Sequence, residues 1–409
     1  MTRSVRVRFL LGHAYGRGGA VRSTLNTAAA MAERGHDVEI VSLVKRRARP
    51  AYPLPDAVRI RILTPSRRLL APGWTSPRRL LRRLARIVLQ RIPSRIFPPG
   101  DKWYSSVSLF TDVALGRYLR RQHDCVLIGT NPGLNLALAR LAPADAITIG
   151  QEHLHLARRA ASRRNLMRAS YPALDAVVTL TEDDAEQYRA LLPSTYVEAI
   201  PNAVPEGRSH QTTDVIHAST VVAAGRLTAQ KGFDLLIRAW AVASRDNPGW
   251  RLHIHGTGPD RRLLRNLIVE LGVEERTTLM GHTDDMSSVF TSAGLFVLSS
   301  RYEGFPMVML EAMSHGLPIV AFDCPTGPAE LVEDGVTGRL VSPGATAELA
   351  TTMSDLLRQP ELRDRMGQAA KARSRQWDRG RIAGRWEDLF RRLEERRRDD
   401  RLSRLQRLA

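Results

Sequence analysis

The stretch VVAAGRLTAQKGF, residues 221–233, decides the fold prediction. Its first four residues have the apolar pattern of a short buried strand that ends at Ala224. A glycine then lets the backbone turn, and the following pattern predicts a helix that begins at Phe233. Arg226 and Lys231 lie between the two elements, before the helix N-terminus, where positive charges and free amides favour a phosphate group. A surface loop with ordinary charges is the alternative for this stretch taken alone.

The same alternation of strand and helix extends along the chain in both directions. In the second half we expect strands at 221–224, 252–255, 277–280, 295–298 and 319–322, and helices at 233–245, 261–271, 306–315 and 347–357. In the first half we expect strands at 5–11, 38–44, 125–128, 146–150, 176–180 and 197–200. This alternation predicts an α/β fold with two doubly wound Rossmann-like domains facing across a cleft. In such sheets, ligands bind beyond the carboxyl ends of the strands.

A polar, irregular segment around residues 203–217 marks the expected domain boundary. We therefore predict an N-terminal domain over 1–205, a C-terminal domain over 206–380 and a helical tail over 381–409.

Composition excludes several classes of protein. The 409 residues include 61 Lys and Arg against 42 Asp and Glu, a net charge of +19 that favours anionic partners. Two distant cysteines do not make a disulfide framework, and no apolar run is long enough for a secretory signal or a membrane span. We expect a cytoplasmic protein.

Two further elements follow predicted strands in the second half. The turn at Gly256 and Gly258 would let a ligand approach the backbone closely. The segment EGFPMVMLEAM, residues 303–313, starts a helix at Pro306 and leaves backbone amides free to receive an anion. Glu311 lies within this apolar helix and needs hydrogen-bond donors such as sugar hydroxyls, with an internal hydrogen bond as the alternative.

Together these motifs resemble a known family. Gly-Arg-x4-Lys-Gly at 225–232, Gly-x-Gly-Pro at 256–259, Glu-x7-Glu at 303–311 and Gly-Pro-x-Glu…Asp-Gly-x-x-Gly at 327–338 look like a retaining glycosyltransferase of family 4 with the GT-B fold. The resemblance implies an N-terminal domain that binds the acceptor. It also implies a C-terminal domain that binds a nucleoside diphosphate sugar, and a terminal helix that crosses back to the first domain.

The resemblance also implies roles for individual residues. Arg226 and Lys231 would neutralise the donor diphosphate, Glu311 would hold the ribose hydroxyls, and Glu303 would contact the transferred sugar. His153 matches a histidine that touches the donor sugar from the N-terminal side, with a structural histidine as the alternative. His153, Glu303, Arg226 and Lys231 form the expected catalytic set. The remaining expected donor contacts are Gly18, Gly19, Gly225, Gly256, Gly258, Gly304, Phe305, Pro306, Met307 and Val308.

The expected reaction needs no cofactor beyond the donor, for which we favour UDP over GDP. The chain contains no Asp-x-Asp element, so we expect no metal site. Instead, Arg226 and Lys231 would stabilise the negative charge that develops on the leaving diphosphate. The acceptor would be a glycan, a lipid-linked sugar or a polymer. A sugar-nucleotide epimerase on the same fold and a non-catalytic polyanion-binding protein are the alternatives.

A basic segment stands apart from the rest of the chain. Residues 57–100 contain no Asp or Glu but eleven arginines, and Leu81, Leu84, Ala85, Val88 and Ile92 share one face of a predicted helix. Peripheral docking on the inner face of the cell membrane and a solvated basic face are the two readings. Nucleic acid is not an expected partner, because no recognition motif is present.

Overall fold

The computed structural model describes residues 4–64, 77–204 and 218–408. The chain divides into two compact units, which we call the N-terminal unit (residues 1–203 and 379–409) and the C-terminal unit (residues 204–378). The boundary predicted at residues 205 and 206 lies outside the described residues.

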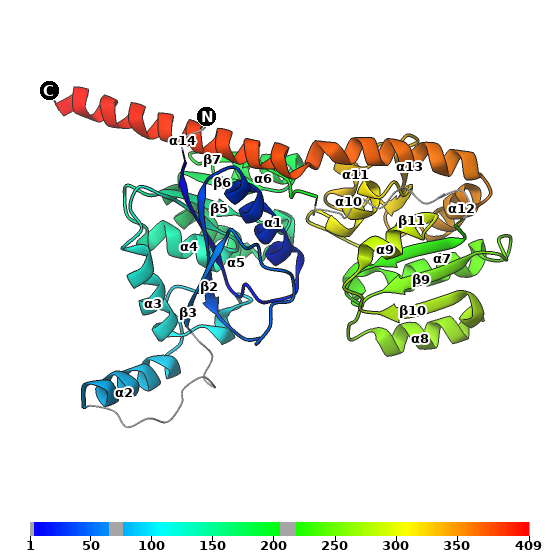
Figure 1. Ribbon diagram of the computed structural model, residues 1–409, viewed down its shortest axis with the longest axis horizontal. Coiled ribbons are helices and arrows are strands. Elements are labelled where there is room, and N and C mark those ends of the chain that lie inside the picture. Colours follow the sequence, from blue (N-terminus) through cyan, green and yellow to red (C-terminus); the bar gives the residue numbers. More distant parts are fainter. Residues whose placement is uncertain (1–3, 65–76, 205–217, 409) are drawn as a thin grey trace. The chain divides into compact units, whose positions relative to one another are not determined.

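The N-terminal unit is built on a seven-stranded sheet in which all neighbouring strands are parallel (Figure 1). The strands lie in the order β3 (Arg59–Thr64), β2 (Asp37–Val44), β1 (Arg6–Leu11), β4 (Val126–Gly129), β5 (Ile147–Gln151), β6 (Ala176–Thr179) and β7 (Tyr196–Ala199). The helices of this unit are α1 (Gly19–Glu33), α2 (Pro77–Arg91), α3 (Leu109–Leu119), α4 (Pro132–Leu141), α5 (Ala161–Ser170), α6 (Glu182–Leu191) and α14 (Arg379–Leu408).

The C-terminal unit repeats this architecture with a six-stranded parallel sheet. Its strands lie in the order β10 (Thr277–Gly281), β9 (Arg251–His255), β8 (Thr220–Ala224), β11 (Leu295–Leu298), β12 (Ile319–Phe322) and β13 (Gly338–Val341). Its helices are α7 (Phe233–Ala243), α8 (Arg261–Glu270), α9 (Met286–Thr291), α10 (Met307–Ser314), α11 (Pro328–Leu331), α12 (Thr346–Leu357) and α13 (Pro360–Ser374). The predicted fold class, two doubly wound α/β domains, is confirmed.

Each unit has a core of its own, because its sheet is covered by helices. The central strands β4, β11 and β12 are buried at every position, as expected for parallel strands covered on both faces. The N-terminal core includes the fully buried rings of Phe9, Tyr171 and Tyr188, and the C-terminal core includes Trp240 and Phe322.

Two strands were missed by the sequence analysis, and both lie at the edge of a sheet. β3 alternates arginine with isoleucine and is mostly half-buried or exposed, so its sequence cannot be told from the rest of the basic segment, residues 57–100, in which it lies. β13 has four residues, one of them an exposed arginine. Edge strands lack the continuous apolar run that reveals a central strand.

The long helix α14 packs along the N-terminal unit (Figure 1). Trp386, Leu389 and Phe390 on one of its faces are buried. Glu387 accepts two hydrogen bonds from Arg34, at 2.7 and 2.6 Å, and lies 2.9 Å from Nε2 of His36. Further along, Arg397 donates to both carboxylate oxygens of Asp175 at 2.7 Å, so polar contacts extend over more than two turns.

In the described part of the chain, every helix is too short or too polar to cross a membrane.

Candidate functional site

The strongest candidate site lies where strands β8, β11 and β12 end in the C-terminal unit. There the Nζ atom of Lys231 lies 2.6 Å from Oε1 of Glu303. Ser300 donates a hydrogen bond to the same oxygen at 2.6 Å, and Glu303 is only 7% exposed. The structure therefore brings two of the predicted catalytic residues into direct contact, although 72 positions separate them in the sequence.

Backbone and side-chain hydrogen bonds hold the Lys231 loop against the Glu303 loop. Gln230 donates to the carbonyl of Tyr302 at 3.1 Å and accepts from the amide of Arg301 at 2.8 Å through its own carbonyl. Gly232 has a left-handed φ of 61°, and a Cβ there would lie 2.0 Å from the carbonyl oxygen of Ser299. This close approach explains the glycine that follows Lys231.

An ion pair braces the same two loops and was missed by the sequence analysis. Arg301 donates to both carboxylate oxygens of Asp234, at 2.8 and 2.7 Å, and to the carbonyl of Ala229 at 2.7 Å. The hydrogen bond from Arg301 lowers the pKa of Asp234. Asp234 lies in the first turn of α7, so its negative charge also stabilises the N-terminus of this helix. The sequence shows an acid at a helix start and an arginine two residues before Glu303, but no local pattern indicates that these two residues form an ion pair.

The glycine turn after β9 packs against the loop after β8. A Cβ on Gly256 would lie 1.8 Å from the carbonyl oxygen of Gly225, and one on Gly258 would lie 2.1 Å from that of Leu227. The amide of Leu227 also donates to the carbonyl of Thr257 at 3.0 Å. Backbone packing thus requires both glycines, and their contact with a ligand stays a prediction.

Helix α10 begins at Met307, directly after Pro306 and next to the Glu303 loop. The loop of Glu303, Gly304 and Phe305 is fixed by the loop that follows β12, because the amide of Glu303 donates to the carbonyl of Pro325 at 2.9 Å. Val308 is half-buried in the first turn, whereas Glu311 is buried on the second. These positions put a helix N-terminus close to Glu303 and its partner Lys231, an arrangement that favours an anion.

Arg226 differs from Lys231 because it is exposed. Within the described residues, no carboxylate lies within ion-pair distance of its guanidinium group. A cation at the carboxyl end of β8 is therefore available to an incoming anion.

In the N-terminal unit, Gly18 and Gly19 lie directly after the β1 loop, where α1 begins. Gly18 has a φ of 153°, and its amide donates to the hydroxyl of Tyr52 at 3.2 Å. A Cβ on either glycine would meet no atom within 4 Å. Open space in front of a helix start is compatible with the predicted approach of a diphosphate.

His153 follows β5, and its Nε2 atom is buried without a hydrogen-bond partner among the described residues. Burial, together with the positive charge of Arg159, lowers the pKa of His153 to about 4. The imidazole is therefore neutral near pH 7, and its Nε2 atom can form a hydrogen bond with a ligand hydroxyl.

Glu152, the neighbour of His153, turns into the core of the unit. Its carboxylate accepts hydrogen bonds from Tyr171 at 2.6 Å, Asn135 at 2.9 Å and Arg159 at 2.7 Å. A Cβ on Gly129, at the end of β4, would lie 2.3 Å from Oδ1 of Asn135. This buried network anchors the backbone that carries His153 and gives Glu152 a supporting position.

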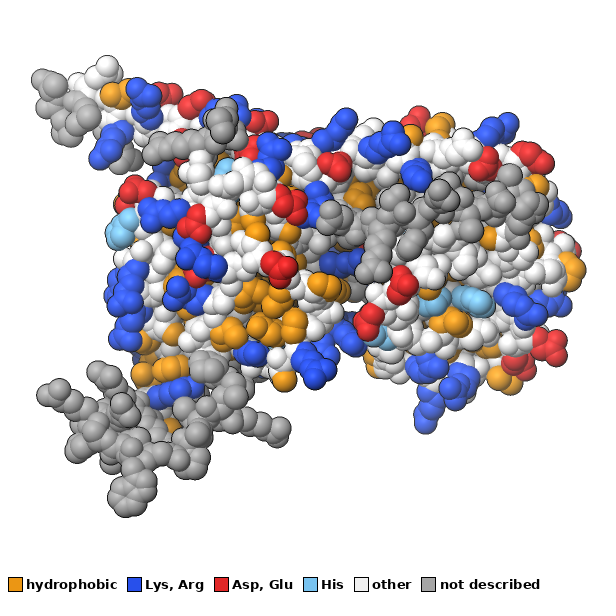
Figure 2. Space-filling view, viewed as in Figure 1, with side chains coloured by type: hydrophobic (Ala, Val, Ile, Leu, Met, Phe, Trp, Pro, Cys, Tyr) orange, Lys and Arg blue, Asp and Glu red, His pale blue; other side chains and the backbone are white. Residues whose placement is uncertain are grey.

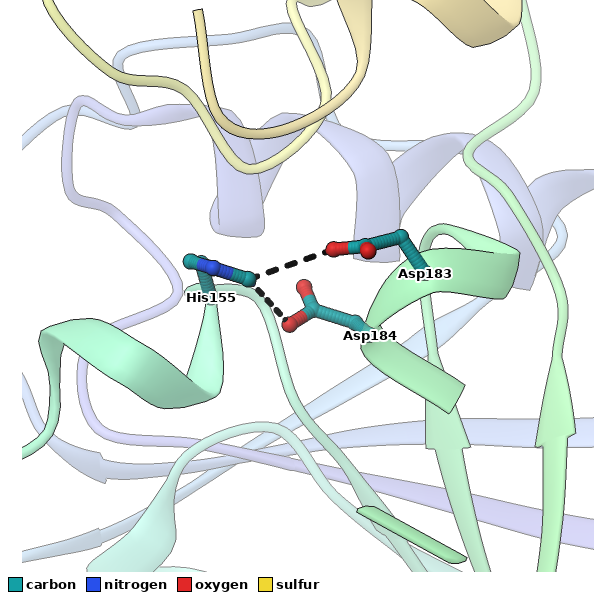
Figure 3. A group of neighbouring side chains, drawn as sticks. All are labelled: His155, Asp183 and Asp184. Carbon is teal, nitrogen blue, oxygen red and sulfur yellow. Dashed lines mark hydrogen bonds and ion pairs between the residues drawn. The ribbon is translucent and has the colours of Figure 1, made fainter. Parts of the chain in front are cut away.

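One group of described side chains has the composition of a metal site (Figure 3). His155, Asp183 and Asp184 place one ligand atom each within 4.8 Å of one another. However, Nδ1 of His155 lies 2.6 Å from Asp184, which also accepts from the amide of Leu156 at 3.0 Å. These hydrogen bonds tie the loop after β5 to the start of α6 without an ion, so the expectation of no metal stays a prediction.

Two family models match the chain. The model "Glycosyl transferases group 1" matches residues 217–373, and the model "Glycosyltransferase Family 4" matches residues 17–208. Together they cover most of both units.

Individual relatives and solved structures also match the chain. The chain is 35% identical to an exopolysaccharide phosphotransferase of Streptomyces coelicolor over 97% of its own length, but it spans only 42% of that protein. It is 30% identical to the amylovoran biosynthesis glycosyltransferase AmsD of Erwinia amylovora, over 70% of this chain and 83% of that protein. Among solved structures, Staphylococcus aureus TarM, crystallised with fondaparinux, α-GlcNAc-glycerol and UDP, matches with a TM-score of 0.74. The match has 15% identity and covers 94% of this chain and 99% of that chain.

Proposed function

Because the chain belongs to the GT-B glycosyltransferases, we propose that it transfers a sugar from a nucleoside diphosphate sugar to a glycan, lipid-linked or polymer acceptor, with retention of the anomeric configuration. The contact between Lys231 and Glu303 beside the start of α10 carries this proposal. It provides a cation for a diphosphate and a carboxylate for sugar hydroxyls within one hydrogen bond of each other.

The chemistry of transfer matches these groups. The bond between the anomeric carbon and the leaving phosphate oxygen breaks, the acceptor oxygen bonds to that carbon on the same face, and the acceptor proton passes to the leaving phosphate. Lys231 and Arg226 stabilise the negative charge that grows on the diphosphate. As the diphosphate takes over Lys231, the carboxylate of Glu303 is released to accept hydrogen bonds from the transferred sugar. No step in this scheme uses a metal ion.

We favour UDP as the nucleotide, supported by the UDP named with the TarM structure. Calorimetric titration with UDP, GDP, ADP and CDP, in the presence of a chelator, tests this choice. We expect selective binding of UDP, which Glu311→Ala weakens and Glu270→Ala, an exposed acid at the end of α8, leaves unchanged. Equal binding of all four nucleotides with a steep dependence on salt would support a polyanion-binding protein instead.

The stereochemical outcome distinguishes a retaining transferase from its alternatives. The anomeric proton coupling of the product, measured by NMR against that of the donor, reports retention or inversion. We expect the same configuration in both, and an acceptor-dependent reaction. A change in the sugar of the free nucleotide without any acceptor would identify an epimerase.

We also propose that α2 docks the enzyme on the cytoplasmic face of an anionic membrane. Leu84 and Val88 are 51% and 57% exposed, although they belong to the apolar face of the helix, and residues 57–100 contain no acid to repel anionic lipid. Buried apolar side chains and arginines near the surface both add to membrane affinity.

Flotation with vesicles that contain anionic lipid tests this docking. We expect the protein to float at low salt and Leu84→Ser with Val88→Ser to reduce floating. The matched control is Leu263→Ser with Val269→Ser, which removes two side chains of α8 that are 59% and 58% exposed. Failure of the wild-type protein to float, or equal loss with both variants, would contradict the proposal.

A further inference from the structure

A group of aromatic and cationic side chains lies where β1 and β2 end in the N-terminal unit. The indole ring of Trp103 packs on Gly12, so closely that a Cβ there would lie 2.3 Å from the ring. Arg46 and Lys102 lie 6.0 and 5.8 Å from the centre of this ring. Lys45 lies 4.4 Å from the centre of the Tyr15 ring. Because parallel strands end at one edge of the sheet, these residues share the edge at which ligands bind in this fold.

The cations of this group are not paired with acids in the described part of the chain. Among the described residues, no carboxylate lies within ion-pair distance of Lys45, Arg46 or Lys102. The nearby carboxylate of Asp101 is already bound by Arg163 at 3.2 Å and has a side chain only 4% exposed. Elsewhere in the unit, arginines such as Arg34 do have carboxylate partners. An excess of positive charge is therefore concentrated at this edge, and a ligand with a negative charge would neutralise it.

A buried histidine provides an independent sign of a ligand. His13 is 5% exposed, its Nδ1 lies 3.2 Å from the carbonyl oxygen of Val44, and its Nε2 is buried without a partner among the described residues. Burial, with a smaller effect of the charges on Arg46 and Arg47, lowers the pKa of His13. The neutral ring donates its Nδ1 proton to Val44 and leaves Nε2 as an acceptor. A buried acceptor without a donor costs free energy, which a ligand hydroxyl would recover.

We propose that this edge, formed by His13, Tyr15, Lys45, Arg46, Lys102 and Trp103, binds an acceptor glycan that carries a carboxylate or phosphate group. A sugar hydroxyl would donate to Nε2 of His13, the apolar face of a sugar ring would stack on an aromatic side chain, and the negative group would contact the cations. Only the identification of this glycan as the acceptor rests on the proposed function. The donor diphosphate has its own cations, Lys231 and Arg226, in the other unit.

Binding of defined oligosaccharides to the full chain tests this proposal. The probes are an oligogalacturonate for the carboxylate, a glycerol phosphate oligomer for the phosphate, and a neutral malto-oligosaccharide of matched length, at 150 mM salt. We expect one anionic probe or both to bind at least about tenfold more tightly than the neutral one. The anionic probe that binds more tightly identifies the charged group. Equal affinity for all three overturns the proposal.

Variants separate this site from general charge attraction. Lys45→Gln with Arg46→Gln should weaken binding of the anionic probe by about tenfold, because two charge contacts with the ligand are lost. Arg120→Gln, an exposed arginine that precedes β4 at the opposite edge of the sheet, should change it little. Equal loss with the control overturns the proposal. His13→Phe should weaken binding and His13→Gln should restore part of it, with thermal unfolding measured to show that both variants fold.

Titration of UDP with the same variants distinguishes this anionic acceptor site from the proposed donor site. Unchanged UDP affinity in Lys45→Gln with Arg46→Gln supports an acceptor site, whereas a parallel loss assigns these cations to the donor and overturns the inference. Selective binding of the anionic probe by a chain that binds no nucleotide would contradict the proposed transferase function but keep the anionic site.

Discussion

The two units differ in how most of the positive charge at their strand ends is held. In the C-terminal unit, Lys231 pairs with Glu303 and Arg301 pairs with Asp234, so these two cations are held in place before any ligand binds, whereas Arg226 has no carboxylate partner among the described residues. In the N-terminal unit, Lys45 and Arg46 lie over aromatic rings without a described carboxylate partner. Paired charges fix geometry but must be exchanged when a ligand arrives, whereas unpaired charges attract a ligand without fixing its geometry. The first arrangement suits a reacting diphosphate, and the second suits a variable acceptor.

The glycine loops of the two units also differ, because Gly256 packs against backbone whereas Gly19 faces open space. This difference gives the largest predicted effect. Gly256→Ala should destabilise the C-terminal unit by about 4 kcal/mol, because it adds a Cβ 1.8 Å from the carbonyl oxygen of Gly225 at a φ of 145°. Denaturant unfolding monitored by circular dichroism measures this loss.

Gly19→Ala is the matched control in the N-terminal unit. Nothing lies within 4 Å of the added Cβ, so stability should stay within about 0.5 kcal/mol of wild type. A fall in transfer activity at full stability would then report contact with the donor. Equal destabilisation by the two substitutions would remove the contrast between the loops.

Removal of the paired lysine should have the next largest effect. Lys231→Ala takes a cation from the leaving group and leaves Glu303 without its ion-pair partner, so we expect transfer to fall about 10²- to 10³-fold. Single-turnover assays measure the loss. Lys371→Ala removes another of the four lysines, on α13, and should leave the rate unchanged. A loss of less than about threefold would mean that Lys231 serves Glu303 alone.

The sequence was sufficient for the fold class but not for these pairs. Strand and helix periodicity is local, so every strand except the edge strands β3 and β13 could be predicted, together with helices such as α7 and α12, whereas the short helices α9 and α11 were missed. The pairing of Arg301 with Asp234 joins residues 67 positions apart, and only the parallel alignment of β8 and β11 brings them together. The three partners of Glu152 likewise lie on different elements of the N-terminal unit.

Candidate site residues could be predicted where they belong to a recognisable sequence motif. Lys231 and Glu303 were singled out by resemblance, and the structure adds that they touch. Nε2 of His13, which has no hydrogen-bond partner among the described residues, gave no signal in the sequence, because a histidine after a strand is usually structural. Gly256 and Gly258 were singled out for a ligand, but their close packing against backbone became visible only in three dimensions.

An ion pair in the N-terminal unit tests whether the contribution of a charge to stability depends on its pairing or on the unit in which it lies. Glu387→Gln removes the negative charge and one of the two acceptor oxygens that bind Arg34 and His36, and we expect a loss of about 1–3 kcal/mol near pH 7. The hydrogen bond from Arg34 lowers the pKa of Glu387 in the folded state. Its contribution is therefore complete above the unfolded pKa of about 4.3 and disappears as pH falls through the folded value. Urea unfolding between pH 3 and 8 should show the two proteins converge in acid, with Glu394→Gln, an exposed acid on the same helix, close to wild type throughout.

The smallest predicted effect is the most direct test of the unpaired group. If Lys45 and Arg46 have no carboxylate partners, Lys45→Gln with Arg46→Gln should change the free energy of unfolding by less than about 0.5 kcal/mol, since only ring contacts and the bond from Arg46 to Ser106 are lost while repulsion is relieved. Arg61→Gln breaks the 2.9 Å bond to the buried Glu39 and should cost more. Urea unfolding at low and high salt compares them, and higher salt should reduce any gain from the double variant, because it screens the same repulsion. A double variant as destabilised as Arg61→Gln would show that the two cations hold the fold together, and that the N-terminal strand ends are built like those of the C-terminal unit.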